Sequence, residues 1–397
     1  MSFEHSKILN ATSTDVQGLV LDTAAFIHEA PPGVTTISAV VQSNSKSLVD
    51  AFNFKEVQPK DNLKALDFGL EFSWLTTFSA YFNADYIVDI YVPSNMLQYV
   101  KLSGCGNVAV YPHVLANTTT QSLEARVTGS GSIYIQDAAV NLKQLALGVS
   151  GSGNIQFNVP DTKLASGLDM AISGSGDIAL ATTSLLANSV DSSISGSGSL
   201  YLEASKSIDV TSSLSSSISG SGQINYYDLS SSCGRHTIKI SGSGSIHAGA
   251  VTCENTKVSL SGSGSIFTSS KQSLDVSKSG SGSVSIVGAM PPTVSGPIAI
   301  AMSDPVHRLS LAAFPDHKPS HMTQFGTGLT CVLGVVLVLL IALLVRKYGC
   351  CCCHRRCKNP IDATTGPYGE CTTPVAYVIP QTVEANAHKV DVVAKAV

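Results

Sequence analysis

Aliphatic and small polar residues alternate with a period of two through the middle of the chain, around repeated copies of a Ser-Gly-Ser-Gly motif. The residue four positions after the first glycine is Val, Ile or Leu in every copy. The residue two positions before it is aliphatic in every copy but the last, where Lys278 stands. The alternate positions hold Ser, Thr, Asn, Asp or Gln, with Cys105 as the exception. A period of two is typical of β strands with one buried face, whereas an α helix requires a period of 3.6. We therefore predict strands around every motif.

The motif recurs at intervals of 18 to 25 residues, which is the length of one turn of a solenoid. A single strand of this kind cannot bury its aliphatic row, but stacked turns can, and they also pair the backbone of each turn with its neighbours. We predict an all-β fold, a right-handed parallel β-helix of about nine or more coils, with the hand taken from the crossover rule. The first glycines of the copies are Gly104, Gly129, Gly151, Gly174, Gly196, Gly220, Gly242, Gly262 and Gly280.

The glycines themselves allow two interpretations. They point inward where no side chain fits against the opposite wall, or they kink the chain through a positive φ. A flexible Gly/Ser linker is the competing explanation for the motif, but a linker would not keep aliphatic residues in register through nine copies.

The segment Ile-Ser-Gly-Ser-Gly-Asp-Ile at 172–178, its sibling copies and the alternating strand at 86–93 resemble the family called "putative auto-transporter adhesin head GIN domain". The resemblance covers roughly residues 35–288. It implies a parallel β-helix and an adhesin-like role, and it brings no catalytic residues. The bacterial members of this family are typically exported.

The rest of the chain divides by composition. We expect an irregular segment at 1–34, an aromatic-rich cap or first coils at 35–100, and the repeat solenoid at 101–288. Six prolines and three histidines (His307, His317 and His321) mark 289–327 as an extended stalk. The irregular spacing of these histidines favours a solvated linker over a metal site.

An uncharged apolar stretch runs from Gly328 to Val345 and is just long enough to cross a bilayer as a single transmembrane helix. Basic residues follow it, so the positive-inside rule places the solenoid outside, at the plasma membrane, and the disordered tail 346–397 in the cytosol. The N-terminus has no apolar stretch typical of a signal peptide. Either the true start differs, or the anchor itself directs insertion; in the second case the solenoid can remain cytosolic.

Two groups of cysteines and two asparagines mark further candidate sites of modification. S-palmitoylation is expected at Cys350, Cys351, Cys352, Cys353 and Cys357, beside basic residues, because adjacent cysteines cannot easily converge on one zinc ion. Cys233 and Cys253 each precede the next glycine by nine residues, so they stack on neighbouring coils as a disulfide or as two free thiols. Asn10 and Asn117 begin glycosylation sequons.

Little in the sequence indicates catalysis. The formal net charge is −4 and 13% of residues are charged, without a basic stripe, so no nucleic-acid partner is expected. The solenoid acids that we considered (Asp137, Asp161, Asp177, Asp209, Asp228 and Asp275) are scattered by register. We therefore expect no catalytic, metal or cofactor site.

We hypothesise a membrane-anchored, adhesin-like solenoid that presents rows of serines at the cell surface to a glycan or protein ligand. A structural scaffold whose tail recruits a cytosolic partner is the first alternative. A carbohydrate-active enzyme is the second, because parallel β-helices include polysaccharide lyases and hydrolases.

Overall fold

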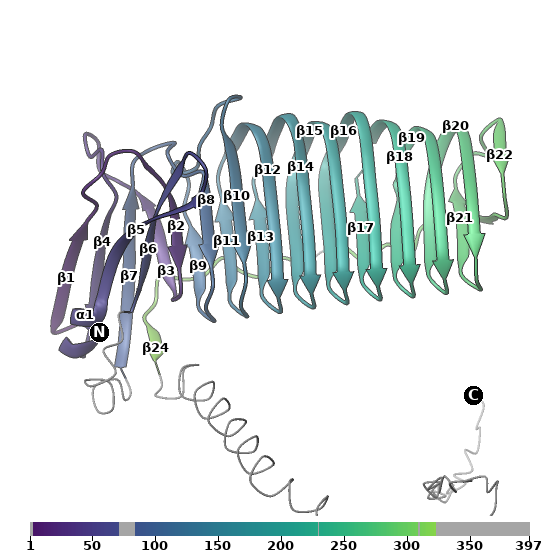
Figure 1. Cartoon of the computed structure of the whole chain (residues 1–397). Coiled ribbons are helices and arrows are strands. Elements are labelled where there is room, and N and C mark those ends of the chain that lie inside the picture. The colour runs from purple at the N-terminus through teal and green to yellow at the C-terminus, as the bar shows by residue number, and fades with distance from the viewer. Residues whose placement is uncertain (1–2, 71–83, 229, 309, 323–397) are drawn as a thin grey trace, which may run out of the picture. The chain divides into compact units, whose positions relative to one another are not determined.

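The computed structural model describes residues 3–70, 84–228, 230–308 and 310–322, all within one compact unit, 1–327. Most of the unit is a solenoid of parallel coils stacked along one axis (Figure 1). In a typical coil, the short strand β13 (Asn154–Asn158) is followed by a bend and the longer strand β14 (Asp161–Gly174). Successive coils pair in parallel, so that Gly151 lies beside Gly174 and Gly174 beside Gly196. The predicted all-β solenoid is confirmed.

The aliphatic residues of the repeat form the dry interior. Ile155, Ile178 and Leu200 lie in register on three successive coils and are at most 1% exposed. Their burial is the main favourable contribution to folding, at about 25 cal/mol for each Å² of apolar surface removed from water. The repeat strands are β8 (Tyr99–Leu102), β9 (Asn107–Val110), β10 (Ser122–Val127), β11 (Ser132–Gln136), β12 (Ala139–Gly151), β15 (Asp177–Gly196), β16 (Ser199–Gly220), β17 (Gln223–Tyr227), β18 (Ser230–Gly242), β19 (Ser245–Gly262), β20 (Ser265–Ser279) and β21 (Ser283–Val287).

The glycine pairs turn the chain between the two strands of each coil. From Gly151 to Gly280 the first glycine of each motif has a positive φ, between +145° and +112°, which other residues rarely adopt. The second glycine is pressed against the preceding coil: a Cβ on Gly198 would overlap the carbonyl oxygen of Gly176 and lie 2.9 Å from Ile172 Cγ2. The close approach is therefore to the coil below and not to the opposite wall.

The N-terminal end departs from the expected order. Strands β2 (Val16–Leu21) and β3 (Ala25–Glu29) form a coil of their own, although we expected residues 1–34 to be irregular. This coil pairs in parallel with β8 and β9 on one side. On the other side it pairs with β6 (Leu63–Leu70) and β7 (Ala84–Val92), which come later in the sequence.

Antiparallel strands finish this end of the solenoid. Strand β4 (Ser38–Ser43) pairs with β7, β1 (His5–Asn10) pairs with β4, and β5 (Phe52–Lys60) pairs with β6. The helix α1 (Lys46–Ala51) packs beside them, with Leu48 and Val49 buried. The antiparallel strands and the helix interrupt the parallel stacking, as caps of solenoids do.

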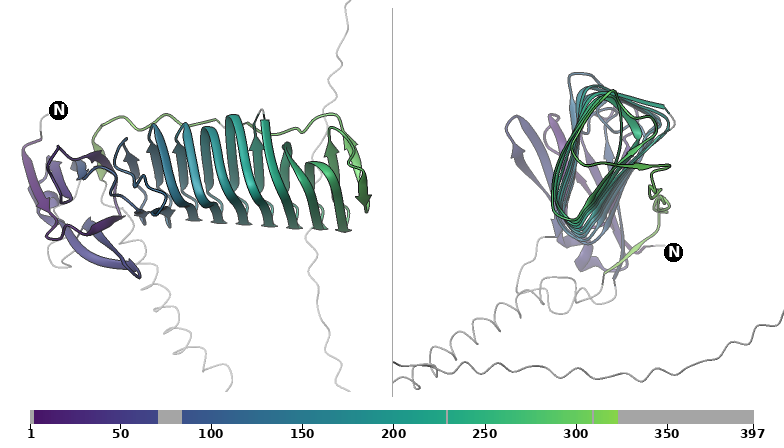
Figure 2. Two further views of the ribbon diagram at one scale, coloured as in Figure 1. Left: turned by 90° about the horizontal axis from the view of Figure 1, so that it is seen from above. Right: turned by 90° about the vertical axis from the view of Figure 1, so that its right-hand side faces the viewer.

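The segment that we expected to be an extended stalk lies against the solenoid. Strands β22 (Thr293–Ser295) and β23 (Ala299–Ala301) pair with the last coils. Residues 302–308 and 310–322, which we call the strap, then run back along one side to the N-terminal end (Figure 2). There β24 (Ser320–Met322) pairs with β7 in antiparallel orientation.

The transmembrane helix in the predicted fold class needs correction. Within residues 3–70, 84–228, 230–308 and 310–322, no helix combines the length and apolar character that a membrane crossing requires. The helix α1 has six residues, about 9 Å at 1.5 Å per residue. The stretch 328–345 and the tail 346–397 lie outside the described residues, so the supported fold class is the all-β solenoid alone.

Candidate ligand-binding face of the solenoid

One side of the solenoid presents rows of small polar residues to solvent. The position just before the first glycine of each motif points outward and is an exposed serine on seven successive coils, stacked in register. The position two residues earlier forms a second outward row on the same side. We call these two rows the serine face: Ser150, Ser173, Ser195, Ser219, Ser241, Ser261 and Ser279, with Gly148, Ala171, Ser193, Ser217, Lys239, Ser259 and Ser277.

A groove of about 450 Å³ runs along the N-terminal half of this face. Its lining includes Gly148 and Ala171, whose side chains are absent or small, and hydroxyls such as those of Ser195 and Ser217. The side chain of Arg126 lies in the same row one coil before Gly148 and also lines the groove. The groove therefore offers hydroxyl donors and acceptors beside one guanidinium.

Charged groups gather at the N-terminal end of the groove. Glu124 is ion-paired with Arg126 and with Lys60 of β5, and its side chain is 11% exposed. Burial, and then the charge of Arg126, lower the pKa of Lys60. The paired charges keep Arg126 in place while leaving its side chain half exposed to a ligand.

Two carboxylates that sequence analysis missed lie beside the groove. Asp169 and Asp191 are register partners on neighbouring coils, and Asp169 is a lining residue. Burial, and then the charge of Asp191, raise the pKa of Asp169. Counted forward from the first glycine of the preceding motif, the two residues have different positions. Counted backward, each stands five residues before the first glycine of the following motif. Counting backward from Gly174 and Gly196 would have paired them.

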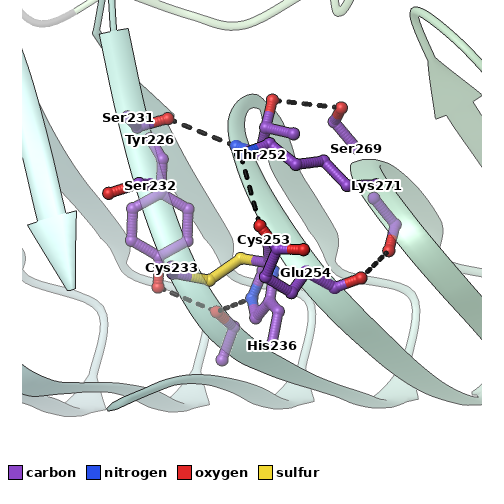
Figure 3. The surroundings of a disulfide bond; sticks show 12 residues. Tyr226, Ser231, Ser232, Cys233, His236, Thr252, Cys253, Glu254, Ser269 and Lys271 are labelled. Atoms are coloured by element: carbon purple, nitrogen blue, oxygen red, sulfur yellow. Dashed lines mark hydrogen bonds and ion pairs between the residues drawn. A yellow bond between two sulfur atoms is a disulfide. The ribbon is translucent and has the colours of Figure 1, made fainter. Parts of the chain in front are cut away.

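A disulfide joins two coils in the C-terminal half of the solenoid. Cys233 and Cys253 are register partners, their Cα atoms lie 4.4 Å apart, and the structure links them in a disulfide. Figure 3 shows a polar cluster beside it. The Ser216 hydroxyl lies 2.8 Å from the Tyr226 hydroxyl and 2.9 Å from His236 Nε2.

The polar cluster is closed to solvent. Tyr226, Ser216 and His236 are each 0% exposed. Burial raises the pKa of Tyr226 to about 12 and lowers the pKa of His236 to about 3. The histidine is therefore neutral at physiological pH, and the cluster is part of the interior and not of a ligand site.

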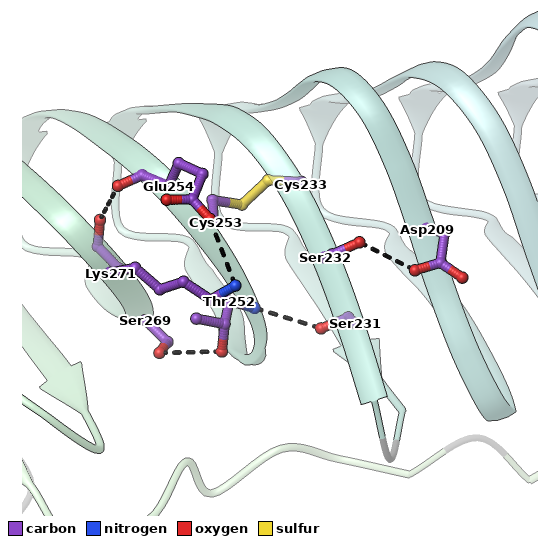
Figure 4. Close-up of polar contacts among 10 residues, drawn as sticks. Asp209, Ser231, Ser232, Cys233, Thr252, Cys253, Glu254, Ser269 and Lys271 are labelled. Carbon is purple, nitrogen blue, oxygen red and sulfur yellow. Dashed lines mark hydrogen bonds and ion pairs between the residues drawn. A yellow bond between two sulfur atoms is a disulfide. The ribbon is translucent and has the colours of Figure 1, made fainter.

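Outside the disulfide, polar side chains link neighbouring coils along the surface (Figure 4). The Ser232 hydroxyl donates to Asp209 Oδ1 at 2.9 Å, and the Thr252 hydroxyl donates to Ser269 Oγ at 3.2 Å. The Ser232–Asp209 contact is exposed and the Thr252–Ser269 contact is partly buried, and each stabilises the coil stack only modestly. They show that outward polar rows are a general property of this solenoid, whereas the groove is confined to the serine face.

The remaining predicted sites are placed as follows. Asn10 and Asn117 are exposed, and Asn117 Oδ1 accepts a hydrogen bond from the Asn141 backbone at 2.7 Å. Their glycosylation stays a prediction. The candidate lipidation sites Cys350, Cys351, Cys352, Cys353 and Cys357 lie outside the described residues.

Two histidines of the predicted stalk, His317 and His321, contact aspartates of the solenoid unit, whereas His307 is exposed as we expected. His317 Nε2 lies 2.6 Å from Asp89 Oδ1, and His28 Nε2 lies 3.0 Å from the same oxygen. His321 Nδ1 lies 2.6 Å from Asp85 Oδ1. No sequence signal predicts these contacts, because the partners stand 61 to 236 residues apart.

The family model for "Putative auto-transporter adhesin, head GIN domain" matches residues 71–227 and 211–289, together more than half of the chain. The chain belongs to this family. The predicted resemblance is confirmed, and the solenoid with its serine face is this chain's version of the head GIN domain. A comparison with curated proteins finds no match.

Three solved structures are among those similar to this chain. A putative adhesin from Parabacteroides merdae is 17% identical, with a TM-score of 0.41, and the alignment covers 75% of this chain and 94% of that one. A putative adhesin from Bacteroides fragilis is 18% identical, with a TM-score of 0.43, over 61% of this chain and 96% of that one. A putative lipid binding protein from Parabacteroides distasonis is 18% identical, with a TM-score of 0.36, over 75% and 97%.

Proposed function

We propose that this head GIN domain protein is a non-catalytic recognition protein that binds a glycan through the serine face. The observation that carries the proposal is the alignment of seven exposed serines on successive coils, four of which (Ser150, Ser173, Ser195 and Ser219) line the groove. Hydroxyl groups both donate and accept hydrogen bonds, so they match the hydroxyls of a sugar. Repetition at about 4.8 Å from coil to coil offers many such contacts to an extended ligand.

The charges near the groove support an oligosaccharide better than a strongly charged polymer. Arg126 is already paired with Glu124, and Asp169 and Asp191 add negative charge along the same side. A polyanion such as a nucleic acid would meet these carboxylates without a basic stripe to compensate. A neutral or mildly charged sugar chain avoids this cost.

We also propose that the solenoid works at the cell surface. The description of the family as an adhesin domain fits a surface-exposed protein. The Cys233–Cys253 disulfide is a second support, because disulfides persist mainly in oxidising compartments. Protease treatment of intact cells, followed by detection of the solenoid, tests this location: a solenoid that stays intact until the cells are lysed would contradict it.

Binding to a glycan array tests the ligand proposal. We expect the purified protein to bind a subset of glycans, and Ser195→Arg and Ser217→Arg to abolish the signal, because each places a long charged side chain in the groove. Ser232→Arg is the matched control, since Ser232 is an exposed serine on a different side of the coil. A blank array, or equal binding by all three variants, would contradict the proposal. Binding that depends instead on residues 346–397 would favour a scaffold role.

Asp169 and Asp191 favour one second candidate, a carbohydrate-active enzyme. A carboxyl group with a raised pKa beside a second carboxylate is the arrangement that glycoside hydrolysis uses. Incubation with a panel of polysaccharides tests it by the release of reducing ends. Release that disappears in Asp169→Asn would favour the enzyme over a purely binding role.

A further inference from the structure

Two histidines and an aspartate from three distant parts of the chain meet where the strap returns to the N-terminal end. His28 belongs to β3, Asp89 to β7 and His317 to the strap. Their nearest nitrogen and oxygen atoms all lie within 4.8 Å of one another. Within the part of the chain that the structure describes, this is the group of three whose side chains could jointly hold a metal ion.

The three side chains differ in how far they are exposed to solvent. The Asp89 side chain is 10% exposed, that of His28 is 25% exposed and that of His317 is 47% exposed. The His28 ring stacks on Tyr111, with centroids 4.5 Å apart, and the His317 ring lies 4.7 Å from Phe26. The aromatic contacts restrict the imidazoles, while the partial exposure of His317 lets an ion reach the group from solvent.

The donor set matches the preferences of zinc. Imidazole nitrogen and carboxylate oxygen bind Zn²⁺ at about 2.0–2.2 Å, which places tetrahedral ligand atoms roughly 3.4 Å apart. The two His–Asp separations, 2.6 and 3.0 Å, have to lengthen by less than 1 Å to admit the ion.

We propose that His28, Asp89 and His317 bind a zinc ion that fastens the strap to the N-terminal coil, with water as the fourth ligand. The ion would replace two hydrogen bonds to one carboxylate oxygen with three coordinate bonds. Since Asp89 and His317 are 228 residues apart in the sequence, the site would fasten the returning strap directly to the N-terminal end of the solenoid. This site is separate from the serine face and does not depend on its function.

Cobalt titration of the full chain tests the proposal, because Co²⁺ occupies zinc sites and absorbs visible light when bound in a tetrahedral geometry. The chain is first treated with an alkylating reagent, so that Cys105 and any other free thiol cannot bind the ion. We expect one Co²⁺ per chain, displaced by Zn²⁺. His317→Gln and His28→Gln should weaken binding by about 100-fold, since even loss of an outer contact to a ligand weakens metal affinity 10- to 100-fold.

His321→Gln is the matched control, because His321 lies on the same strap and contacts a different aspartate, Asp85. It should bind cobalt as the wild type does. The circular dichroism of each variant shows whether it is folded. Because His317 is partly exposed, its substitution should disturb the fold less than that of His28. A wild-type chain without saturable cobalt absorption would overturn the proposal, and so would equal affinity in wild type and His317→Gln.

Discussion

His236 lies in the solenoid interior and should make the protein sensitive to acid. It is 0% exposed, its Nε2 lies 2.9 Å from the Ser216 hydroxyl, and burial lowers its pKa to about 3. In the unfolded chain the pKa of the same imidazole is near its ordinary value of 6.5. The change to test is His236→Gln, which keeps a polar side chain of similar reach but removes the titration.

The sign and the magnitude follow from proton linkage. Between pH 6.5 and pH 3 the unfolded chain binds a proton at His236 while the folded protein does not, so stability is complete above pH 6.5 and falls as the pH is lowered. One unit of pKa difference corresponds to about 1.4 kcal/mol. We therefore expect the free energy of unfolding to lose about 3 kcal/mol at pH 4 from this residue alone.

Urea unfolding of wild type and variant, equilibrated at several pH values between 7.5 and 4, measures the effect. The difference between the two proteins cancels the titration of every other group. It should stay constant above pH 7 and shift in favour of His236→Gln by about 3 kcal/mol by pH 4. His307→Gln, at an exposed histidine, should show no such shift. A difference between wild type and His236→Gln that does not change with pH would refute the reasoning, because it would mean that the imidazole can be protonated in the folded protein.

Three further predictions concern stability. Replacing both Cys233 and Cys253 by alanine opens a 20-residue loop, so the free energy of unfolding under oxidising conditions should fall by about 3 kcal/mol; no change would mean that the bridge is absent. Gly198→Ala should cost about 1–3 kcal/mol by calorimetry, because its methyl would meet the preceding coil, whereas the exposed Ser197→Ala should be nearly neutral. Burial raises the pKa of Asp228 to about 6, so its carboxyl disfavours folding increasingly as the pH rises from about 4 through 6. Asp228→Asn should therefore stabilise the protein at pH 7 by about 1–2 kcal/mol in urea titrations, and a loss of stability would contradict this.

The repeated coils could be predicted because their information is local. Each motif carries its own aliphatic residues, such as Ile155 and Ile178, and its own turn glycines, so register follows from counting. Small bulges within the coils, such as the one between Leu164 and Gly167, absorb the differences in repeat length. The same bulges are the reason why counting forward from the preceding motif did not pair Asp169 with Asp191.

The N-terminal coil could not be predicted in the same way. Leu21 and Ala25, the register partners of Leu102 and Val108, are separated by a shorter turn without the glycine motif. Its neighbours on one side also come from residues 63–92, so the stacking order differs from the chain order. Nothing in the local pattern shows where such a coil is inserted.

The strap was missed for a different reason. A proline-rich polar segment has no hydrophobic period, and its conformation is determined by the surface on which it lies. Gln156 exchanges two hydrogen bonds with the Ala312 backbone, at 2.9 and 3.0 Å. Asp304 accepts a hydrogen bond from the Gly249 backbone at 2.8 Å. Contacts with single polar residues of different coils thus determine where the strap lies. These residues are aligned along one side only after the solenoid has folded.

The strap also sets a length requirement for evolution of this protein. Between its contacts at Asp304 and Ala312, the strap passes from the coil of Gly249 to the coil of Gln156. It therefore extends by about two residues for each coil that it crosses. Duplication or loss of one 22-residue coil would leave it too short or too long to reach β7. Relatives that keep such a returning segment should therefore change the two together, lengthening or shortening it by about two residues for every coil gained or lost.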